Sequence, residues 1–331
     1  MSIQTATSLP PAKSPAALAA GALKKTGVTN LRKPRLKSLR DEAFSGFTGL
    51  IFGKSGSGKT DFFVQLMVGA KTPLRAIYVN TDIGAGGFAT IKARLKALNR
   101  LDLIDNIAVL DIGGHFDEKG NEISGYEEFY EFLTNPWDAE MMAFDPSLLF
   151  WDGSGTFQSV DVVDYVLDKG EVSGVAGATD LRTENLVMEK VGKGESWEAR
   201  KRATVRCFDK FGTLKRPDGK VLHKFMTMFE GSRQVPVDRD NPTAGSRQEL
   251  TGLPLLSGFG VFDQIKGMAD LVIKTSVTDK EGGKVKEYKY YTGGPKNVEG
   301  KVRALELDIE IAPDAAALFN ALIDACDLEG K

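Results

Sequence analysis

The stretch "LIFGKSGSGKTDFF", residues 50–63, decides the fold of this chain. Residues 53–60 within it match the phosphate-binding pattern G-x-x-x-x-G-K-[ST]. The apolar run before it predicts a buried strand, and "KTDFFVQLMVGA" after it predicts a helix. Phe62, Phe63, Leu66 and Met67 fall on the inner face of that helix. Strand, glycine-rich loop and helix in this order predict a P-loop, a site that holds phosphate.

Each residue type in this loop has a chemical reason. The glycines let the backbone curl, so that successive N–H groups point at phosphate oxygens, and the helix N-terminus adds its dipole. Lys59 is expected to place its ammonium at the β- and γ-phosphates, and the Thr60 hydroxyl is expected to ligate Mg²⁺. The predicted nucleotide-binding residues are Gly53, Lys54, Ser55, Gly56, Ser57, Gly58, Lys59 and Thr60.

A P-loop also needs a carboxylate for the Mg²⁺ shell, at the end of a buried strand. "LLFWD", residues 148–152, is such a strand, and we predict that Asp152 has this role. The alternative is that Asp152 only caps the next helix. Asp111, at the end of "VLD", is a rival that fewer apolar residues precede.

The nucleotide is predicted to be ATP. Asp111-Ile112-Gly113-Gly114 fits the D-x-x-G of guanine-nucleotide proteins by letter, but the N-K-x-D that recognises guanine occurs nowhere in the chain. We therefore expect ATP and Mg²⁺ as the cofactors.

Strands and helices alternate along the body of the chain. Such alternation predicts an α/β fold, a mostly parallel sheet covered by helices on both faces. A C-terminal β-hairpin and a terminal helix are expected to follow it. The expected strands are 47–52, 75–82, 107–112, 147–153 and 220–231, the helices 59–70, 88–101, 126–133, 159–169, 196–211 and 313–328, and the hairpin 270–294.

Composition bounds the remaining possibilities. Residues 1–40 hold eight Lys or Arg and no acidic residue, and we predict a flexible basic arm before an ATPase domain at 41–331. The arm is either a solvated tail or a contact to phosphate or a neighbouring subunit. Two Cys and two His without metal-ligand spacing argue against a zinc site. The two distant cysteines predict a reducing, cytoplasmic compartment, the host cytoplasm if the protein is viral. No apolar run is long enough to span a membrane, so we expect no membrane segment.

The order of the motifs resembles the RecA-like P-loop ATPases. In that family an acidic residue polarises the attacking water at the end of the strand after the P-loop helix, which here reads "YVNTD" and ends at Asp82. A later strand, here "FMTMFE", ends in a residue that senses the γ-phosphate, and Glu230 is closest in register. The resemblance thus implies Lys59, Asp82 and Glu230 as catalytic residues, with Ser232 and Arg233 as the alternative sensors.

Residues 44–310 are similar, more narrowly, to phage-encoded RecA-like ATPases of the AAA type, relatives of recombinases associated with single-strand annealing. This resemblance implies that the protein assembles into a ring or filament. It also implies that a Lys or Arg of "GGPKNVEGKVR" reaches the γ-phosphate of the neighbouring subunit, and the candidates are Lys296, Lys301 and Arg303. An ordinary solvated hairpin end is the alternative for these residues.

The resemblance also implies single-stranded DNA as the partner, bound on loops that follow the Asp152 strand and the sensor strand. We predict two such loops, 174–196 and 231–252, and Arg233, Arg239 and Arg247 of the second as phosphate contacts. A basic helix with Arg200, Lys201, Arg202 and Arg206 is another candidate surface.

The leading hypothesis is therefore an ATP-hydrolysing, oligomeric protein that acts on DNA in recombination or single-strand annealing. Two alternatives remain open: a viral DNA-packaging or assembly motor, and a vestigial nucleotide-binding structural protein.

Overall fold

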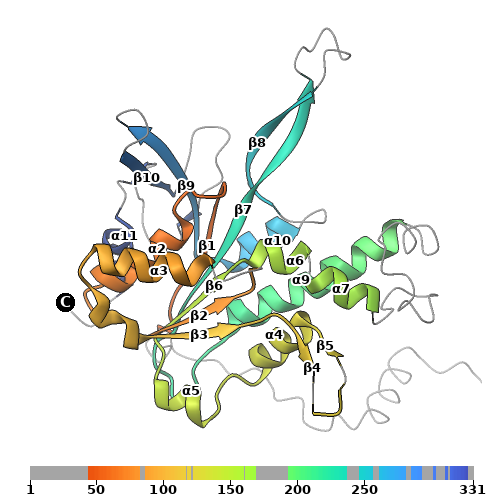
Figure 1. The fold of residues 1–331 in the computed structure, drawn as a ribbon, viewed down its shortest axis with the longest axis horizontal. Helices are drawn as coiled ribbons and strands as arrows, with labels where there is room; N and C mark the ends of the chain where they lie inside the picture. The colour runs from red at the N-terminus through yellow and green to blue at the C-terminus, as the bar shows by residue number, and fades with distance from the viewer. Residues whose placement is uncertain are drawn as a thin grey trace, which may run out of the picture. The chain divides into compact units, whose positions relative to one another are not determined.

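A computed structural model of the chain describes residues 44–326 apart from several gaps (Figure 1). The gaps are 83–85, 117, 121, 160, 169–192, 237–245, 256–260, 281–284, 293–300, 303–309 and 312–313. The predicted basic arm, 1–40, therefore lies outside the described residues.

In the first part of the chain, helices and strands alternate as predicted. Near its end, strands pair antiparallel with one another. The elements are β1 (Thr48–Gly53), α2 (Lys59–Gly69), β2 (Ala76–Asn80), α3 (Gly86–Ala97), η2 (Leu101–Asn106), β3 (Ile107–Asp111), β4 (His115–Phe116), β5 (Glu122–Ile123), α4 (Gly125–Thr134), α5 (Ala139–Phe144), β6 (Leu148–Asp152), α6 (Ser154–Ser159), α7 (Asp161–Asp168), α9 (Lys193–Thr213), β7 (His223–Pro236), β8 (Ser246–Pro254), α10 (Val261–Met268), β9 (Leu271–Lys280), β10 (Val285–Tyr291), β11 (Lys301–Val302), β12 (Glu310–Ile311) and α11 (Ala315–Cys326).

The main sheet has the order β12-β10-β9-β1-β7-β6-β2-β3. The strands from β9 to β3 in this order are parallel to their neighbours, and β10 and β12 extend the sheet with antiparallel pairs. The P-loop strand β1 is separated from β6, which ends at Asp152, by one inserted strand, β7. Because the parallel strands run the same way, the carboxyl ends of β1, β7, β6 and β2 meet at one edge of the sheet.

Helices cover both faces of this sheet. One face packs against α4, α6, α7, α9 and α10, and the other packs against α2, α3 and α11. Neighbouring residues of β6 point to opposite layers, as a strand requires: Phe150 packs with α2 and Trp151 packs with α9. The predicted α/β fold, with its C-terminal hairpin and terminal helix, is confirmed.

The predicted inner face of the P-loop helix is confirmed, since Phe62, Phe63, Leu66 and Met67 are all buried. In the next helix Ile91 and Leu95 are buried as expected, but Leu98 is 45% exposed. The helix ends at Ala97, so Leu98 lies in the turn that follows and no longer keeps the helical phase.

The prediction of a loop at 231–252 is wrong for 231–236 and 246–252, which form strands, and 237–245 lie outside the described residues. Strand β7 continues through this stretch to Pro236, and β8 returns beside it in an antiparallel ribbon, so that Arg233 pairs with Glu249. Figure 1 shows the β7–β8 ribbon projecting beyond the helical layers. Charged residues, Pro and Gly hide the alternation of apolar and polar residues by which strands are recognised in a sequence. The backbone hydrogen bonds of each strand come from its pairing with the other.

The first predicted loop, 174–196, lies outside the described residues except for its last four, which begin helix α9. In α9, Arg200 is buried while Arg202 and Arg206 are exposed. The proposed basic surface of this helix therefore lacks Arg200. Among the described residues, no helix is long and apolar enough to span a membrane.

Candidate nucleotide-binding site

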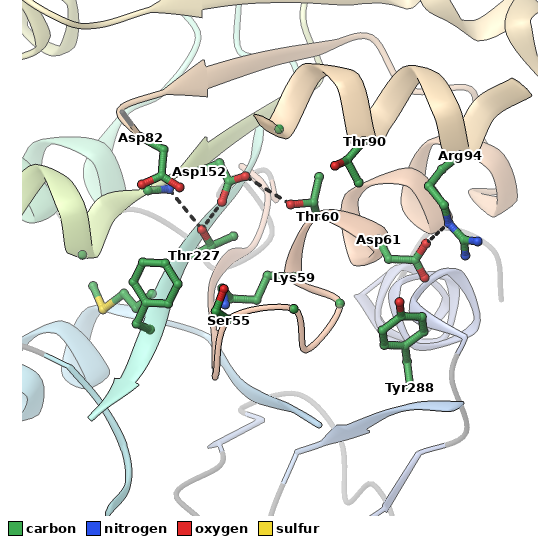
Figure 2. A pocket seen from close by; sticks show the side chains of 17 residues that line it. Ser55, Lys59, Thr60, Asp61, Asp82, Thr90, Arg94, Asp152, Thr227 and Tyr288 are labelled. Atoms are coloured by element: carbon green, nitrogen blue, oxygen red, sulfur yellow. Dashed lines mark hydrogen bonds and ion pairs between the residues drawn. The ribbon is translucent and has the colours of Figure 1, made fainter. Parts of the chain in front are cut away.

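A pocket of about 340 Å³ opens at the sheet edge where β1, β2, β6 and β7 end (Figure 2). The P-loop forms its floor, α3 forms one wall, and the ends of β6 and β7 form another. Its lining residues are Ser55, Gly56, Gly58, Lys59, Thr60, Asp61, Asp82, Gly87, Thr90, Arg94, Asp152, Gly153, Gly155, Thr227, Met228, Phe229 and Tyr288.

The curl of the P-loop depends on its glycines. Gly56 and Gly58 have φ angles of 73° and 96°, in the left-handed region that L side chains rarely adopt. A Cβ on Gly58 would also lie 2.5 Å from Cδ1 of Tyr288, whose ring packs on the loop. Helix α2 begins at the next residue, Lys59, and so directs its N-terminal N–H groups into the pocket.

Ser57 anchors the loop rather than lining the pocket. It is fully buried, and its hydroxyl lies 2.5 Å from the hydroxyl of Thr275 on β9. The predicted binding residues thus divide into two groups. Ser55, Gly56, Gly58, Lys59 and Thr60 line the pocket, whereas Gly53, Lys54 and Ser57 are not among its lining residues.

Lys59 is held in the pocket by the loop itself. Its Nζ donates to the carbonyl oxygens of Gly53 and Lys54, both at 3.0 Å, and lies 4.6 Å from the centre of the Phe229 ring. Burial lowers the pKa of Lys59 to about 8, against the opposing effect of nearby carboxylates, of which Asp152 is the strongest. A bound polyphosphate would restore the charge that burial disfavours.

Asp152 is the centre of the polar contacts. Thr60 Oγ1 donates to Asp152 Oδ2 at 3.3 Å, and the Tyr78 hydroxyl donates to the same oxygen. Asp152 Oδ1 accepts from the hydroxyl of Thr227, which in turn accepts from the Gly153 N–H at 3.2 Å. Burial and the Asp152 charge raise the pKa of Tyr78, which keeps its phenol protonated and donating.

Thr60 and Asp152 fit a Mg²⁺ ion. They present a hydroxyl and a carboxylate oxygen close together, and oxygen is the ligand type that Mg²⁺ prefers. Within the part of the chain that the structure describes, no cluster of three or more His, Cys, Asp or Glu could hold a metal by itself. A cation here would therefore share its ligands with phosphate oxygens and water, as Mg²⁺ does at nucleotides.

Asp82 lies just beyond the end of β2 and faces the same pocket (Figure 2). Thr156, at the start of α6, donates its hydroxyl to Asp82 Oδ1 and so orients the carboxylate. The backbone at Gly153 passes so close that a Cβ there would lie 2.8 Å from the Asp82 nitrogen. The end of β6 and the end of β2 thus place two carboxylates, Asp152 and Asp82, in one pocket.

Glu230 is placed differently from the predicted sensor. Its side chain does not line the pocket, and its Oε1 lies 2.7 Å from Lys274 Nζ on β9. Thr227, Met228 and Phe229 are the β7 residues that line the pocket. Thr227 was missed by sequence reasoning, although a threonine in the apolar run "FMTMF" is a signal that could have identified it.

The other candidates belong to strands of the sheet or lie outside the described residues. Asp111 ends the edge strand β3, where it accepts from Asn80 Nδ2 at 2.7 Å. Lys301 pairs with Val272 of β9, and Arg247 pairs with Val235 of β7. Lys296, Arg303 and Arg239 lie outside the described residues.

No family model matches this chain, and no curated protein matches it. Among solved structures it is similar to the KaiC-like protein PH0186 from the hyperthermophilic archaeon Pyrococcus horikoshii OT3. The TM-score is 0.33 and the identity 12%, over 78% of this chain and 85% of that chain. A likeness this distant carries no argument about function.

The fold class rests on the molecule's own features. The sheet has one strand inserted between the P-loop strand and the Asp152 strand and is covered by helices on both faces, and this α/β architecture agrees with the fold that the RecA-like resemblance implies.

Proposed function

We propose that this protein binds ATP with Mg²⁺ and hydrolyses it. The observation that carries the proposal is the convergence of Lys59, Thr60, Asp152 and Asp82 on one pocket at the N-terminus of α2. A cation, a metal-ligand pair and a separate carboxylate are the groups that phosphoryl transfer to water requires.

Each group has a defined task. The N-terminal N–H groups of α2 and the Lys59 ammonium hold the β- and γ-phosphates and stabilise the charge that develops on them. Lys59 exchanges its carbonyl partners, Gly53 and Lys54, for phosphate oxygens. Thr60 and Asp152 would hold Mg²⁺, which would supply positive charge to neutralise the phosphates.

Asp82 acts on the attacking water. Thr156 donates to one of its carboxylate oxygens, and no side chain of the described residues donates to the other. That oxygen can therefore accept a hydrogen bond from a water molecule beside the γ-phosphate. As the water attacks phosphorus, its proton passes to that oxygen, the bond to the β-phosphate oxygen breaks, and the products are ADP and inorganic phosphate.

ATP hydrolysis tests this proposal. The wild-type chain should release phosphate from MgATP, and Lys59→Ala should abolish release while the far-ultraviolet circular dichroism spectrum stays unchanged. Turnover equal in the two proteins would refute it. ATP binding without turnover in wild type would favour the vestigial binding protein.

A second proposal is that hydrolysis is coupled to single-stranded DNA through the β7–β8 ribbon. Strand β7 contributes Thr227 and Phe229 to the pocket and continues, with a shift of register against β8 between Glu230 and Ser232, to Pro236 in the ribbon. A change at the phosphate therefore has a direct covalent path to the strand that carries Arg233. We further propose that subunits assemble into a ring or filament in which Lys296, Lys301 or Arg303 reaches a neighbour's γ-phosphate.

The DNA proposal is tested by measuring hydrolysis with and without single-stranded DNA at low salt. Stimulation that falls in an Arg233→Gln/Arg247→Gln variant would support it. Absence of both stimulation and DNA binding would refute it, and stimulation by procapsids alone would favour the packaging motor. Electron micrographs with an ATP analogue would separate rings, filaments and monomers.

A further inference from the structure

The pocket has a second end, away from the two carboxylates of the proposed reaction. Three residues of α3 line the pocket from one end to the other: Gly87, Thr90 and Arg94, which fall on one side of the helix at spacings of three and four. A Cβ on Gly87 would lie 2.6 Å from the Tyr78 hydroxyl, so this residue marks the metal end. Arg94 lies seven residues later, about 10 Å further along the helix axis.

Arg94 is fixed at this second end by a buried carboxylate. Its Nε lies 2.6 Å from Asp61 Oδ1, and the Asp61 side chain is 6% exposed. The other Asp61 oxygen accepts from Gln65 Nε2 at 2.9 Å. The Asp61 hydrogen bond raises the pKa of Arg94, so the guanidinium stays charged.

The rest of the Arg94 guanidinium is available to a ligand. Its side chain is 43% exposed, and none of the described residues accepts a hydrogen bond from its terminal amino groups. Figure 2 shows Arg94 bound to Asp61 through Nε, above the ring of Tyr288. These terminal groups are donors only, so they suit oxygen or nitrogen acceptors of a ligand.

Tyr288 supplies an aromatic surface at the same end. It projects from β10 into the pocket, and its ring packs against Gly58, which holds it in place. An aromatic ring that lines a pocket wall offers a surface on which a nucleobase can stack.

The direction of a bound nucleotide follows from these positions. Lys59, Thr60 and Asp152 hold the terminal phosphates and Mg²⁺ at one end, so the nucleoside must extend toward the other. We infer that Tyr288 and Arg94 form the nucleoside subsite: the base stacks on the Tyr288 ring, and Arg94 donates to acceptor atoms of the nucleoside. This inference rests on the proposed nucleotide-binding function and assigns the residues that tell a nucleotide from a bare polyphosphate.

The test compares MgATP with magnesium tripolyphosphate, which has the phosphate chain but no nucleoside. Equilibrium binding of both is measured by calorimetry to wild type, Tyr288→Leu and Tyr288→Phe. Loss of stacking should weaken ATP binding to Tyr288→Leu by about 10-fold. Tripolyphosphate binding should change less than twofold, and Tyr288→Phe, which keeps the ring, should bind ATP like wild type.

Arg94→Lys tests the second residue without removing the charge beside Asp61. Because lysine lacks the planar fork of donors, ATP binding should weaken while tripolyphosphate binding is kept. This separates a direct contact to the nucleoside from a general electrostatic effect.

Each other outcome has a distinct meaning. Equal loss of both ligands in Tyr288→Leu, or no loss of either, would overturn the subsite inference and leave the proposed function standing. Failure of wild type to bind either ligand would overturn the proposed function itself.

Discussion

Nucleotide binding should become weaker as the pH rises above 8, because Lys59 loses its proton there. Burial lowers the pKa of the free enzyme's Lys59 to about 8, although Asp152, Asp82 and Glu230 oppose the shift. A polyphosphate adds negative charge beside the ammonium and raises this pKa again. Binding at pH 8 and above must therefore take up a proton.

The size of the effect follows from the pKa. At pH 9, one unit above it, only about 10% of Lys59 is charged in the free protein. The affinity for MgATP should thus fall about 10-fold for each pH unit above 8, until the pKa of the complex is reached. Below pH 7 Lys59 is charged in both the free and the nucleotide-bound protein, so it adds no pH dependence to the affinity.

Isothermal calorimetry measures both quantities. Titrations at pH 7, 8 and 9 give the affinity, and buffers of different ionisation enthalpy give the number of protons taken up, expected to be about half a proton at pH 8. Lys224 is a matched control, because burial lowers its pKa to about 8 as well but its Nζ donates to Leu214, away from the pocket. The fall of MgATP affinity with rising pH should persist in Lys224→Met and disappear in Lys59→Met.

An affinity for MgATP that is flat from pH 7 to pH 9.5 in wild type, without proton uptake, would refute this reasoning. A slope that persists in Lys59→Met would assign the proton to another group.

Three further predictions concern the reaction, the loop and the core. Asp82→Asn should bind MgATP within twofold of wild type but hydrolyse it about 100-fold more slowly, because the amide cannot accept the proton. Asp111→Asn, on the edge strand, is the control that should change neither binding nor hydrolysis. Unchanged turnover in Asp82→Asn would remove Asp82 from the mechanism. Gly58→Ala should lower the free energy of unfolding, measured in denaturant titrations, by roughly 1–3 kcal/mol, because the φ of Gly58 is 96° and the new Cβ meets Tyr288. A denaturation midpoint equal to that of wild type would show that the loop adopts another conformation. Leu66→Ala, at a fully buried position of α2, should cost about 2–5 kcal/mol, whereas Leu101→Ala, 49% exposed, should cost about 0.5 kcal/mol or less; similar costs would contradict the assigned core.

The sequence was sufficient to predict those features that depend on residues close together in the chain. The P-loop follows from glycines and a lysine at fixed spacing, and Asp152 follows from an apolar strand that ends in a carboxylate. Both lie where the motif predicts, and the inner face of α2 is the one that helical periodicity selects.

The sequence was insufficient where contacts join distant segments. Tyr78 and Thr227 contact Asp152 from strands 70 or more residues away in the sequence. In the sequence alone, neither differs from an ordinary strand residue. The β7–β8 ribbon was mistaken for a loop because its pairing, not its hydrophobic pattern, defines it. Arg200 reads as a surface residue in a basic helix, yet packing of α9 buries it.

The central claim is that Lys59 and the N-terminus of α2 hold the phosphates of a nucleotide. The most direct test is equilibrium binding of MgATP to wild type and to Lys59→Ala at pH 7, where Lys59 is charged. We predict saturable binding of one nucleotide per chain in wild type and a loss of roughly 10- to 100-fold in the variant. Equal affinity in the two proteins, or no binding to wild type, would contradict the claim.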